Sequence, residues 1–367
     1  MTMRRVPFMS LVPLEDAADV RAAIERVIAR GWFVLGPEVE AFESEFAAAM
    51  GAQFAVGVGT GTDAIALILR ALGIGSGDEV ITTPLSAAYS ALAIMMIGAR
   101  PVFCDIDPER LTLDPRLVEP AITPRTKAIL PVHLYGQPAD MTDLEILARR
   151  RNLALVEDCC QAHLATERGR PVGTIGIAGA FSFYPTKNLG ALGDGGAVVT
   201  NDRDLAARLK RLRNGGQIDR YHHQEFGVNS RLDDLQAAVL RARLPWLRRW
   251  TERRRALAAR YRAALSGSSV RVPQEQDPGH VYHLFIVRSQ ARADLQAHLS
   301  SRGVETLIHY PLPIPRQPAL ATMEPADCPL ATRACDEVLS LPLHPALSDE
   351  DVDLVAATLK GHDACVH

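Results

Sequence analysis

The sequence predicts an α/β fold, in which helices cover both faces of a mostly parallel central sheet, followed by a smaller α+β domain. Three observations lead to this prediction. From about residue 52, short apolar runs typical of strands alternate with longer stretches typical of helices. After about residue 245 this alternation stops and a long arginine-rich helix begins. The chain has 367 residues, which is enough for two units. We expect a large domain at residues 1–245 and a small C-terminal domain at 246–367.

The elements of the large domain follow in chain order from these patterns. Short apolar runs bounded by turn residues predict strands, and helical connections between them predict that neighbouring strands run parallel. The expected strands are 52–59, 78–83, 100–106, 127–135, 153–158, 179–184 and 195–200, and the expected helices are 63–72, 90–99, 142–151 and 202–212.

The region from residue 229 onward is expected to be mainly helical. Ser230 and Asp233 resemble the capping box that begins a helix. Pro245 should kink or end that helix, because proline lacks the N–H and its ring clashes with the preceding turn. In the next helix the arginines of 248–262 alternate with apolar residues, which predicts a solvated face.

The composition indicates an ordinary globular protein and excludes several partners. The net charge is −3 at pH 7, which gives no long-range attraction for nucleic acid or an anionic membrane. No apolar run reaches membrane-spanning length, and Pro7 and Pro13 interrupt the N-terminal stretch, so we expect neither a membrane segment nor a signal peptide. The six cysteines form no C-x-x-C pair, which favours a reducing, cytoplasmic setting and no metal site.

The stretch Gly57–Ala64, GVGTGTDA, is a turn between a predicted strand and a predicted helix. Free N–H groups at a helix N-terminus bind phosphate well, and Thr60 and Thr62 could add hydroxyl donors. The stretch is close to the dinucleotide fingerprint, but that motif needs an acidic residue closing the next strand, about 20 residues on. Here that strand runs into Pro84, so the turn predicts phosphate binding rather than NAD binding. A tight turn that simply needs glycines is the alternative.

A carboxylate pair ends one of the predicted strands. The apolar run 153–158 closes with Glu157 and Asp158. Ligands bind at the carboxyl ends of strands in an open α/β sheet, so a carboxylate here is either a ligand partner or a satisfied helix cap. His163, five residues further on, fits a packed histidine better than a catalyst.

A lysine follows the next predicted strand. Lys187 comes shortly after 179–184 and is therefore delivered to the same edge of the sheet as Asp158. A lone loop lysine is usually solvated, but this one lies between Pro185 and Gly190, where the chain bends. We interpret it as a functional amine, and Ser182 can point the same way.

A lysine, a carboxylate and a phosphate-binding turn together fit one cofactor, pyridoxal 5′-phosphate. Lys187 would form the Schiff base and then move a proton as general base and acid. Asp158 would keep the pyridine nitrogen protonated, because a nearby carboxylate favours the charged form. The sequence therefore predicts a pyridoxal phosphate enzyme with Lys187 and Asp158 as its catalytic residues.

From end to end the chain also resembles the DegT–StrS sugar aminotransferases, which are fold-type-I pyridoxal phosphate enzymes. The similar stretches include GTGTDAIAL, VEDCCQAH, FSFYPTKNLGALGDGGAVVTND, GVNSRLDDLQAAVL and LIHYPLPIPRQPA. The resemblance implies that Lys187 carries the Schiff base, that Asp158 contacts the pyridine nitrogen and that Gln161 hydrogen-bonds the phenolate oxygen. It also implies that Gly61 and Thr62 bind the phosphate.

The same resemblance implies a homodimer with shared active sites. Ser182 would bind the phosphate within one subunit, and Asn229 would reach it from the partner subunit. His163, His309 and Tyr310 match family positions near the substrate entrance.

The resemblance further implies the reaction, which moves the amino group of L-glutamate onto a keto sugar. A lysine rather than a histidine at position 187 favours transamination over the dehydration that some relatives perform. The stretch after it, NLGALGDGG, is more similar to members that act on nucleotide-linked keto-deoxyhexoses than to cyclitol aminotransferases. Cyclitol transamination, lyase chemistry on the same scaffold and a regulatory role are the alternatives. A dinucleotide-dependent oxidoreductase is more distant, because the ribose-binding acid is missing.

Two features depart from the family pattern. Family members carry an aromatic residue after the second strand that stacks on the cofactor ring. Here the stretch TTPLSAAYS places Ala87 and Ala88 there, with Tyr89 as a candidate substitute. Cys160 stands where alanine is common under the ring. For the pyrophosphate of a substrate, which guanidinium groups recognise well, the candidate residues are Arg220, Arg231 and Arg316.

Overall fold

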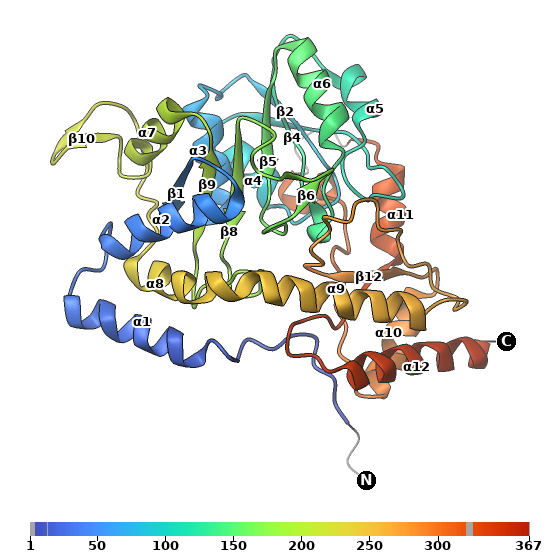
Figure 1. Ribbon diagram of the computed structural model, residues 1–367. Coiled ribbons are helices and arrows are strands. Elements are labelled where there is room, and N and C mark those ends of the chain that lie inside the picture. The colour runs from blue at the N-terminus through green and yellow to red at the C-terminus, as the bar shows by residue number, and fades with distance from the viewer. Residues whose placement is uncertain (1–3, 13, 321–325, 367) are drawn as a thin grey trace.

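The computed structural model describes residues 4–12, 14–320 and 326–366 and has the expected α/β architecture (Figure 1). Its centre is a seven-stranded sheet in the order β1-β9-β8-β5-β4-β2-β3. β9 runs antiparallel to both neighbours, and the other neighbouring pairs are parallel, which confirms the predicted mostly parallel sheet. The strands are β1 (Phe54–Val58), β2 (Glu79–Thr82), β3 (Arg100–Phe103), β4 (Thr126–Leu130), β5 (Ala154–Asp158), β8 (Ala178–Ser182) and β9 (Gly196–Thr200).

Helices cover both faces of this sheet, as predicted. Side chains alternate along a strand, so both faces must be apolar. Ala180 and Val198 pack with α3, α4 and α7 on one face, whereas Phe181 and Val199 pack with α2 and α8 on the other. The helices of this region are α1 (Ala17–Arg30), α2 (Pro37–Met50), α3 (Gly61–Ala71), α4 (Tyr89–Met96), α5 (Pro115–Val118), α6 (Met141–Arg151), α7 (Arg203–Leu212) and α8 (Asp234–Arg243).

A second apolar cluster lies in the C-terminal part of the chain. It combines α9, α10 and α12 with the two-stranded sheet of β12 and β13. Val6 belongs to this cluster and forms a bridge with Val304, so the N-terminal segment contacts the C-terminal region. The division at residues 245 and 246 stays a prediction. The elements are α9 (Leu247–Ala264), β12 (Phe285–Arg288), α10 (Arg292–Ser301), α11 (Pro329–Glu337), β13 (Val338–Leu341) and α12 (Asp349–Val366).

Short elements connect these units. The two-residue to three-residue strands are β6 (Thr166–Glu167), β7 (Arg170–Pro171), β10 (Gln217–Asp219) and β11 (His222–His223), and the single 3₁₀ turns are η1 (Glu119–Ala121), η2 (Leu134–Gly136), η3 (Leu244–Trp246), η4 (Ile314–Arg316) and η5 (Pro318–Leu320). In the described part of the chain, no helix has the length and apolar character needed to cross a bilayer.

Pro245 lies in η3, between α8 and α9, and so ends the first helix as predicted. The two helices lie nearly end to end in Figure 1. The predicted capping box is wrong, because Asp233 precedes α8 without a side-chain cap. Ser230 instead donates to an Asp63 carboxylate oxygen at 2.7 Å and accepts from the Gly59 N–H at 2.9 Å.

The predicted solvated face of α9 is wrong at one position. Arg254 is buried, and its Nη1 donates to the carbonyl oxygens of Tyr282, His283 and Leu343. An arginine can be buried when backbone carbonyls satisfy its donors, and helical spacing alone does not reveal such partners.

Candidate active site

Three strand ends meet at one edge of the central sheet. Val58 at the end of β1 and Ser182 at the end of β8 both pair with Gly196 of β9. Asp158 at the end of β5 pairs with Ala180 of β8. The loops that follow these strands therefore leave the sheet side by side, and they carry the glycine-threonine turn, the carboxylate and the lysine.

The glycine-threonine turn forms the N-terminus of α3. Thr60 caps the helix, since its Oγ1 accepts from the Asp63 N–H at 3.0 Å. Among the hydrogen bonds of the described residues, none uses the N–H groups of Gly61 and Thr62. These free donors point out of the positive end of the helix, which is the arrangement that binds phosphate.

The start of α3 touches the end of β8 closely. A Cβ atom placed on Gly61 would lie 2.8 Å from Ser182 Cβ and 2.7 Å from Cys160 Sγ. Only glycine allows this approach, which brings the free N–H groups next to the Ser182 hydroxyl. The structure thereby gives the predicted turn a steric reason for its glycine.

The Asp158 carboxylate is buried and oriented by two donors. Ser90 of α4 donates its hydroxyl to Oδ2 at 2.7 Å, and the Cys160 N–H donates to Oδ1 at 3.1 Å. The sequence interpretation missed Ser90. Its signal is weak, because α4 follows β2, which lies two strands away from β5 in the sheet.

The neighbouring Glu157 points to the other side of β5 and is fully used by the fold. Its oxygens accept from the N–H groups of Gly173, Ile175 and Gly176 at 2.7–2.8 Å, and His133 Nε2 lies 3.1 Å away. The other ring nitrogen of His133 accepts from the Ala139 N–H. Glu157 therefore stabilises the fold, and Asp158 is the carboxylate of this strand end that remains for a ligand.

Lys187 lies in a turn that its own backbone closes. The Lys187 N–H donates to the Tyr184 carbonyl at 2.8 Å, and a Cβ on Gly190 would lie 2.4 Å from the Pro185 carbonyl oxygen. Burial lowers the pKa of the lysine amine, while the nearby Cys160 and Asp158 act in the opposite direction. A lowered pKa raises the fraction of neutral, nucleophilic amine.

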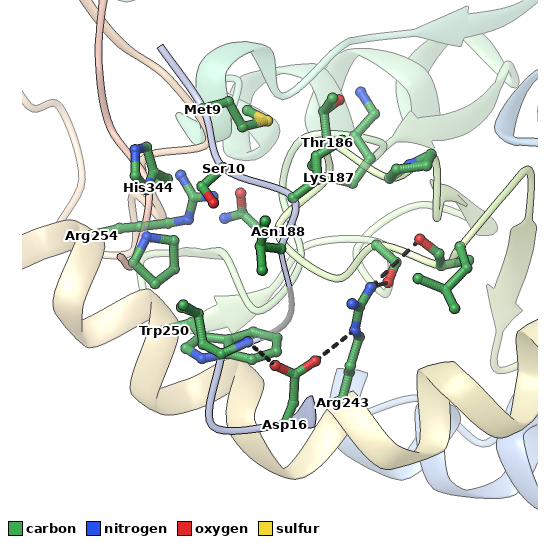
Figure 2. A pocket seen from close by; sticks show the side chains of 18 residues that line it. Met9, Ser10, Asp16, Thr186, Lys187, Asn188, Arg243, Trp250, Arg254 and His344 are labelled. Carbon is green, nitrogen blue, oxygen red and sulfur yellow. Dashed lines mark hydrogen bonds and ion pairs between the residues drawn. The ribbon is translucent and has the colours of Figure 1, made fainter. Parts of the chain in front are cut away.

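A cavity of about 310 Å³ lies on the other side of this turn. Figure 2 shows that the Lys187 side chain rises away from Asp16, Trp250 and Arg243, which form the opposite wall. Lys187 thus belongs to the lining of this cavity, but its amine points away from that wall.

Gln161 is held by two partners in the loop after β5. Its Oε1 accepts from the Tyr135 N–H at 2.7 Å, and its Nε2 donates to the Tyr310 hydroxyl at 3.0 Å. The Cys160 thiol lies 3.8 Å from the Ala180 carbonyl oxygen, and burial raises its pKa, so it stays neutral.

The structure confirms that His163 is a packed histidine, and it corrects the placement of this residue near a substrate entrance. Its side chain is fully buried and packs against the rings of Phe46, Phe181 and Phe183. Burial and then the Lys187 charge lower its pKa to about 3. His309 is partly buried with Nδ1 at 2.9 Å from the Ser340 hydroxyl, and burial lowers its pKa to about 4.

Several predicted residues remain apart from this cluster in the single chain. Tyr89 is 63% exposed at the start of α4, and Asn229 is exposed next to Ser230. The Arg231 guanidinium donates to the Asn214 side chain at 3.0 Å. Arg220 lies 5.2 Å from the centre of the Tyr221 ring, and Arg316 ends η4.

The clustered residues fit pyridoxal phosphate. The free N–H groups of α3 and the Ser182 hydroxyl suit a phosphate, the Asp158 carboxylate suits a protonated pyridine nitrogen, and Lys187 supplies an amine with a lowered pKa. The close approach at Gly61 joins the first two groups into one site.

Comparison with known proteins agrees with this geometry. The model of the DegT/DnrJ/EryC1/StrS aminotransferase family matches residues 15–360. The chain is 51% identical over 349 residues to a dTDP-3-amino-3,4,6-trideoxy-alpha-D-glucose transaminase of Streptomyces venezuelae, covering 94% of this chain and 92% of that protein.

Among the solved structures, similarity extends over nearly the whole chain. S. venezuelae DesV, crystallised with a ketimine intermediate, has a TM-score of 0.95 and 49% identity, with 98% of both chains covered. NtdA from Bacillus subtilis with bound cofactor PMP has a TM-score of 0.92 and 32% identity, covering 98% of this chain and 85% of that one. The chain belongs to the DegT/DnrJ/EryC1/StrS aminotransferase family, a family of pyridoxal-phosphate-dependent enzymes.

Proposed function

We propose that this aminotransferase moves the amino group of L-glutamate onto a nucleotide-linked keto-deoxyhexose in the biosynthesis of an amino sugar. The observation that carries the proposal is the meeting of Asp158, Ser182 and Lys187 with the free N–H groups at the start of α3. The similarity to a transaminase whose name specifies a dTDP-linked trideoxy sugar supports the choice of substrate class.

Each residue of the cluster has a proposed role. The N–H groups of Gly61 and Thr62 and the hydroxyl of Ser182 hold the phosphate, and Asp158 keeps a proton on the pyridine nitrogen. When bound, pyridoxal phosphate supplies the electron sink for the substrate carbon. Lys187 first holds the cofactor and then, once displaced, accepts and returns the substrate proton.

Ser90 and Gln161 support these groups. The Ser90 hydroxyl keeps one Asp158 oxygen occupied at 2.7 Å, so that the other faces the Cys160 N–H and the site. The Gln161 amide is proposed to donate to the phenolic oxygen of the cofactor, since its Nε2 carries a second hydrogen beyond the one given to Tyr310.

We also propose a homodimer in which Asn229 of the partner subunit reaches the phosphate. Support comes from large apolar side chains that are exposed in the single chain, among them Trp32 at 56% and Phe33 at 48%. An exposed apolar patch of this kind is typical of a protein–protein interface. Asn229 is exposed too, next to the Ser230 that braces the phosphate turn.

Mixing two inactive variants tests the shared site. Lys187→Ala and Asn229→Ala homodimers would each have low activity. In a heterodimer of the two variants, one of the two sites would be intact, because the Asn229→Ala subunit supplies Lys187 and the Lys187→Ala subunit supplies Asn229. Recovery of between a quarter and a half of the activity, roughly, supports the arrangement. No recovery after subunit exchange, verified by mass, would show that Asn229 acts within its own subunit, and full activity of the Asn229→Ala homodimer would show that it has no role.

Substrate and donor are tested by following the bound cofactor. L-Glutamate alone should change the visible spectrum and release 2-oxoglutarate, and Lys187→Ala should abolish both changes. A panel of nucleotide-linked keto sugars and keto-cyclitols is then analysed by mass spectrometry. Amine formed only from a cyclitol, or product formed by elimination, would overturn the proposed substrate. Binding of cofactor without reaction with any amino donor would favour a regulatory role.

The cytoplasmic location expected from the sequence is kept as part of the proposal. The five cysteines with described side chains are free thiols, which is typical of a reducing compartment. Fractionation of the native host would test it directly.

A further inference from the structure

Tyr310 and Gln161 form a polar pair between segments far apart in the sequence. Gln161 follows β5, whereas Tyr310 lies between α10 and α11. The Gln161 amide cannot turn over without loss, because its Oε1 accepts from the Tyr135 N–H at 2.7 Å. Its Nε2 must therefore face the Tyr310 hydroxyl, to which it donates at 3.0 Å.

The Tyr310 hydroxyl accepts a hydrogen bond from Gln161 and still has its own proton to donate. Burial raises its pKa to about 12, and hydrogen bonds from Gln161 and from the backbone of Ala87 act in the opposite direction. Both of these partners donate to the oxygen, so its own proton needs another acceptor. Among the hydrogen bonds of the described residues, none takes this proton. A partly buried hydroxyl with an unused proton offers a hydrogen bond that a ligand in the site can accept.

The position of the hydroxyl points to the cofactor as that ligand. Gln161, its hydrogen-bond partner, belongs to the loop after β5 that begins at Asp158 and Cys160, so the Tyr310 ring stands beside the loop that would hold the pyridine. Its oxygen also accepts from the backbone of Ala87, one of the two small residues at the position where the resemblance predicts an aromatic residue on the ring.

We propose that Tyr310 is a second donor to the phenolic oxygen of pyridoxal phosphate, acting together with Gln161, which it also holds in position. The inference rests on the proposed function and adds a residue to its site. The Tyr135 hydroxyl belongs to the same network but does not touch the Tyr310 hydroxyl, since it donates to the carbonyl oxygen of His309.

The test is the pH dependence of the visible absorbance of the cofactor bound to Lys187. A donor to the phenolic oxygen stabilises its negative charge and so favours loss of the proton that this oxygen shares with the lysine nitrogen. Tyr310→Phe removes the donor, and the midpoint of the absorbance change should rise by about one pH unit, a tenfold change in the equilibrium.

Tyr135→Phe is the matched control, since it also removes one hydroxyl from the same network but leaves the Gln161 contacts and Tyr310 in place. Its midpoint should stay within a few tenths of a unit of the wild type. Circular dichroism and melting temperature establish that both variants fold. Should Tyr310→Phe not fold, Tyr310→Leu lacks the same hydroxyl and carries the same expectation.

The outcomes separate the inference from the proposed function. An absorbance band that titrates at the wild-type midpoint in the folded Tyr310 variant, or an equal shift in Tyr135→Phe, would overturn the role of Tyr310 alone. Loss of the band in the wild-type protein itself would contradict the proposed function. A shift in the Tyr310 variant only supports the inference.

Discussion

Gly61→Ala tests whether the start of α3 must touch the end of β8 for the phosphate to bind. The added Cβ would lie 2.7 Å from Cys160 Sγ, 2.8 Å from Ser182 Cβ and 3.2 Å from Ser182 Cα. Non-bonded carbon atoms prefer about 3.5–4.0 Å, so the helix has to move by several tenths of an ångström. The backbone at Gly61 does not have a positive φ, so the effect is one of space alone.

The size of the effect follows from this overlap. Forcing one extra methyl group into a packed contact costs about 1–3 kcal/mol. The protein without cofactor can avoid that cost by moving α3 away from β8, and cofactor binding has to reverse the movement. Cofactor affinity should therefore fall by about 10-fold or more.

The assay is titration of the cofactor-free protein with pyridoxal phosphate, followed by visible absorbance. Gly75→Ala is the control, because the nearest atom to its added Cβ is 3.6 Å away. Adding Cys160→Ala to the Gly61 variant removes the nearest atom but leaves the two Ser182 contacts, so affinity should recover only in part. Wild-type affinity in Gly61→Ala would refute the argument that this close approach forms the phosphate site.

Three further predictions concern the groups around the site. Ser90→Ala removes the 2.7 Å hydrogen bond to Asp158 and should weaken cofactor binding about 10-fold, as measured by the same titration, with little change in stability. Glu157→Gln leaves three backbone N–H groups facing a neutral amide and should lower the free energy of unfolding by about 2–3 kcal/mol in urea, while the absorbance band of the bound cofactor persists. Burial holds the folded-state pKa of His163 at about 3, below its unfolded value of about 6.5. Between these two values the unfolded chain binds a proton that the folded chain does not, so stability falls as the pH drops from about 6.5 towards 3. His163→Phe should therefore reduce the stability lost between pH 6.5 and 5 by about 2 kcal/mol in urea titrations at the two pH values, and an unchanged loss would show that this histidine is not buried neutral.

Much of the fold could be predicted because it depends on local patterns. The strands 54–58, 79–82 and 196–200 lie within the predicted runs. Buried strands need continuous apolar residues, and such runs are visible in a single sequence. β5 and β8 are neighbours in the sheet, so Asp158 and Ser182 lie close together at their ends. This placement was predicted from the rule that ligands bind at the carboxyl ends of strands.

The errors share a physical cause, which is that the deciding partner lies far along the chain. Ser230 has the spacing of a helix cap, but it bonds Gly59 and Asp63 of the phosphate turn. Arg254 has the spacing of a solvated residue, but backbone carbonyls some 28 to 89 residues away accept its donors. Ser90 was missed for the same reason, because its contact with Asp158 spans 68 residues.

Lys187 as the residue that holds the cofactor is the central assignment. The chain has only three other lysines, Lys127, Lys210 and Lys360. The purified protein loaded with pyridoxal phosphate is reduced with borohydride, digested and analysed by peptide mass spectrometry. We expect one modified peptide, carrying the added mass on Lys187. Modification of another lysine, or of none, would contradict it.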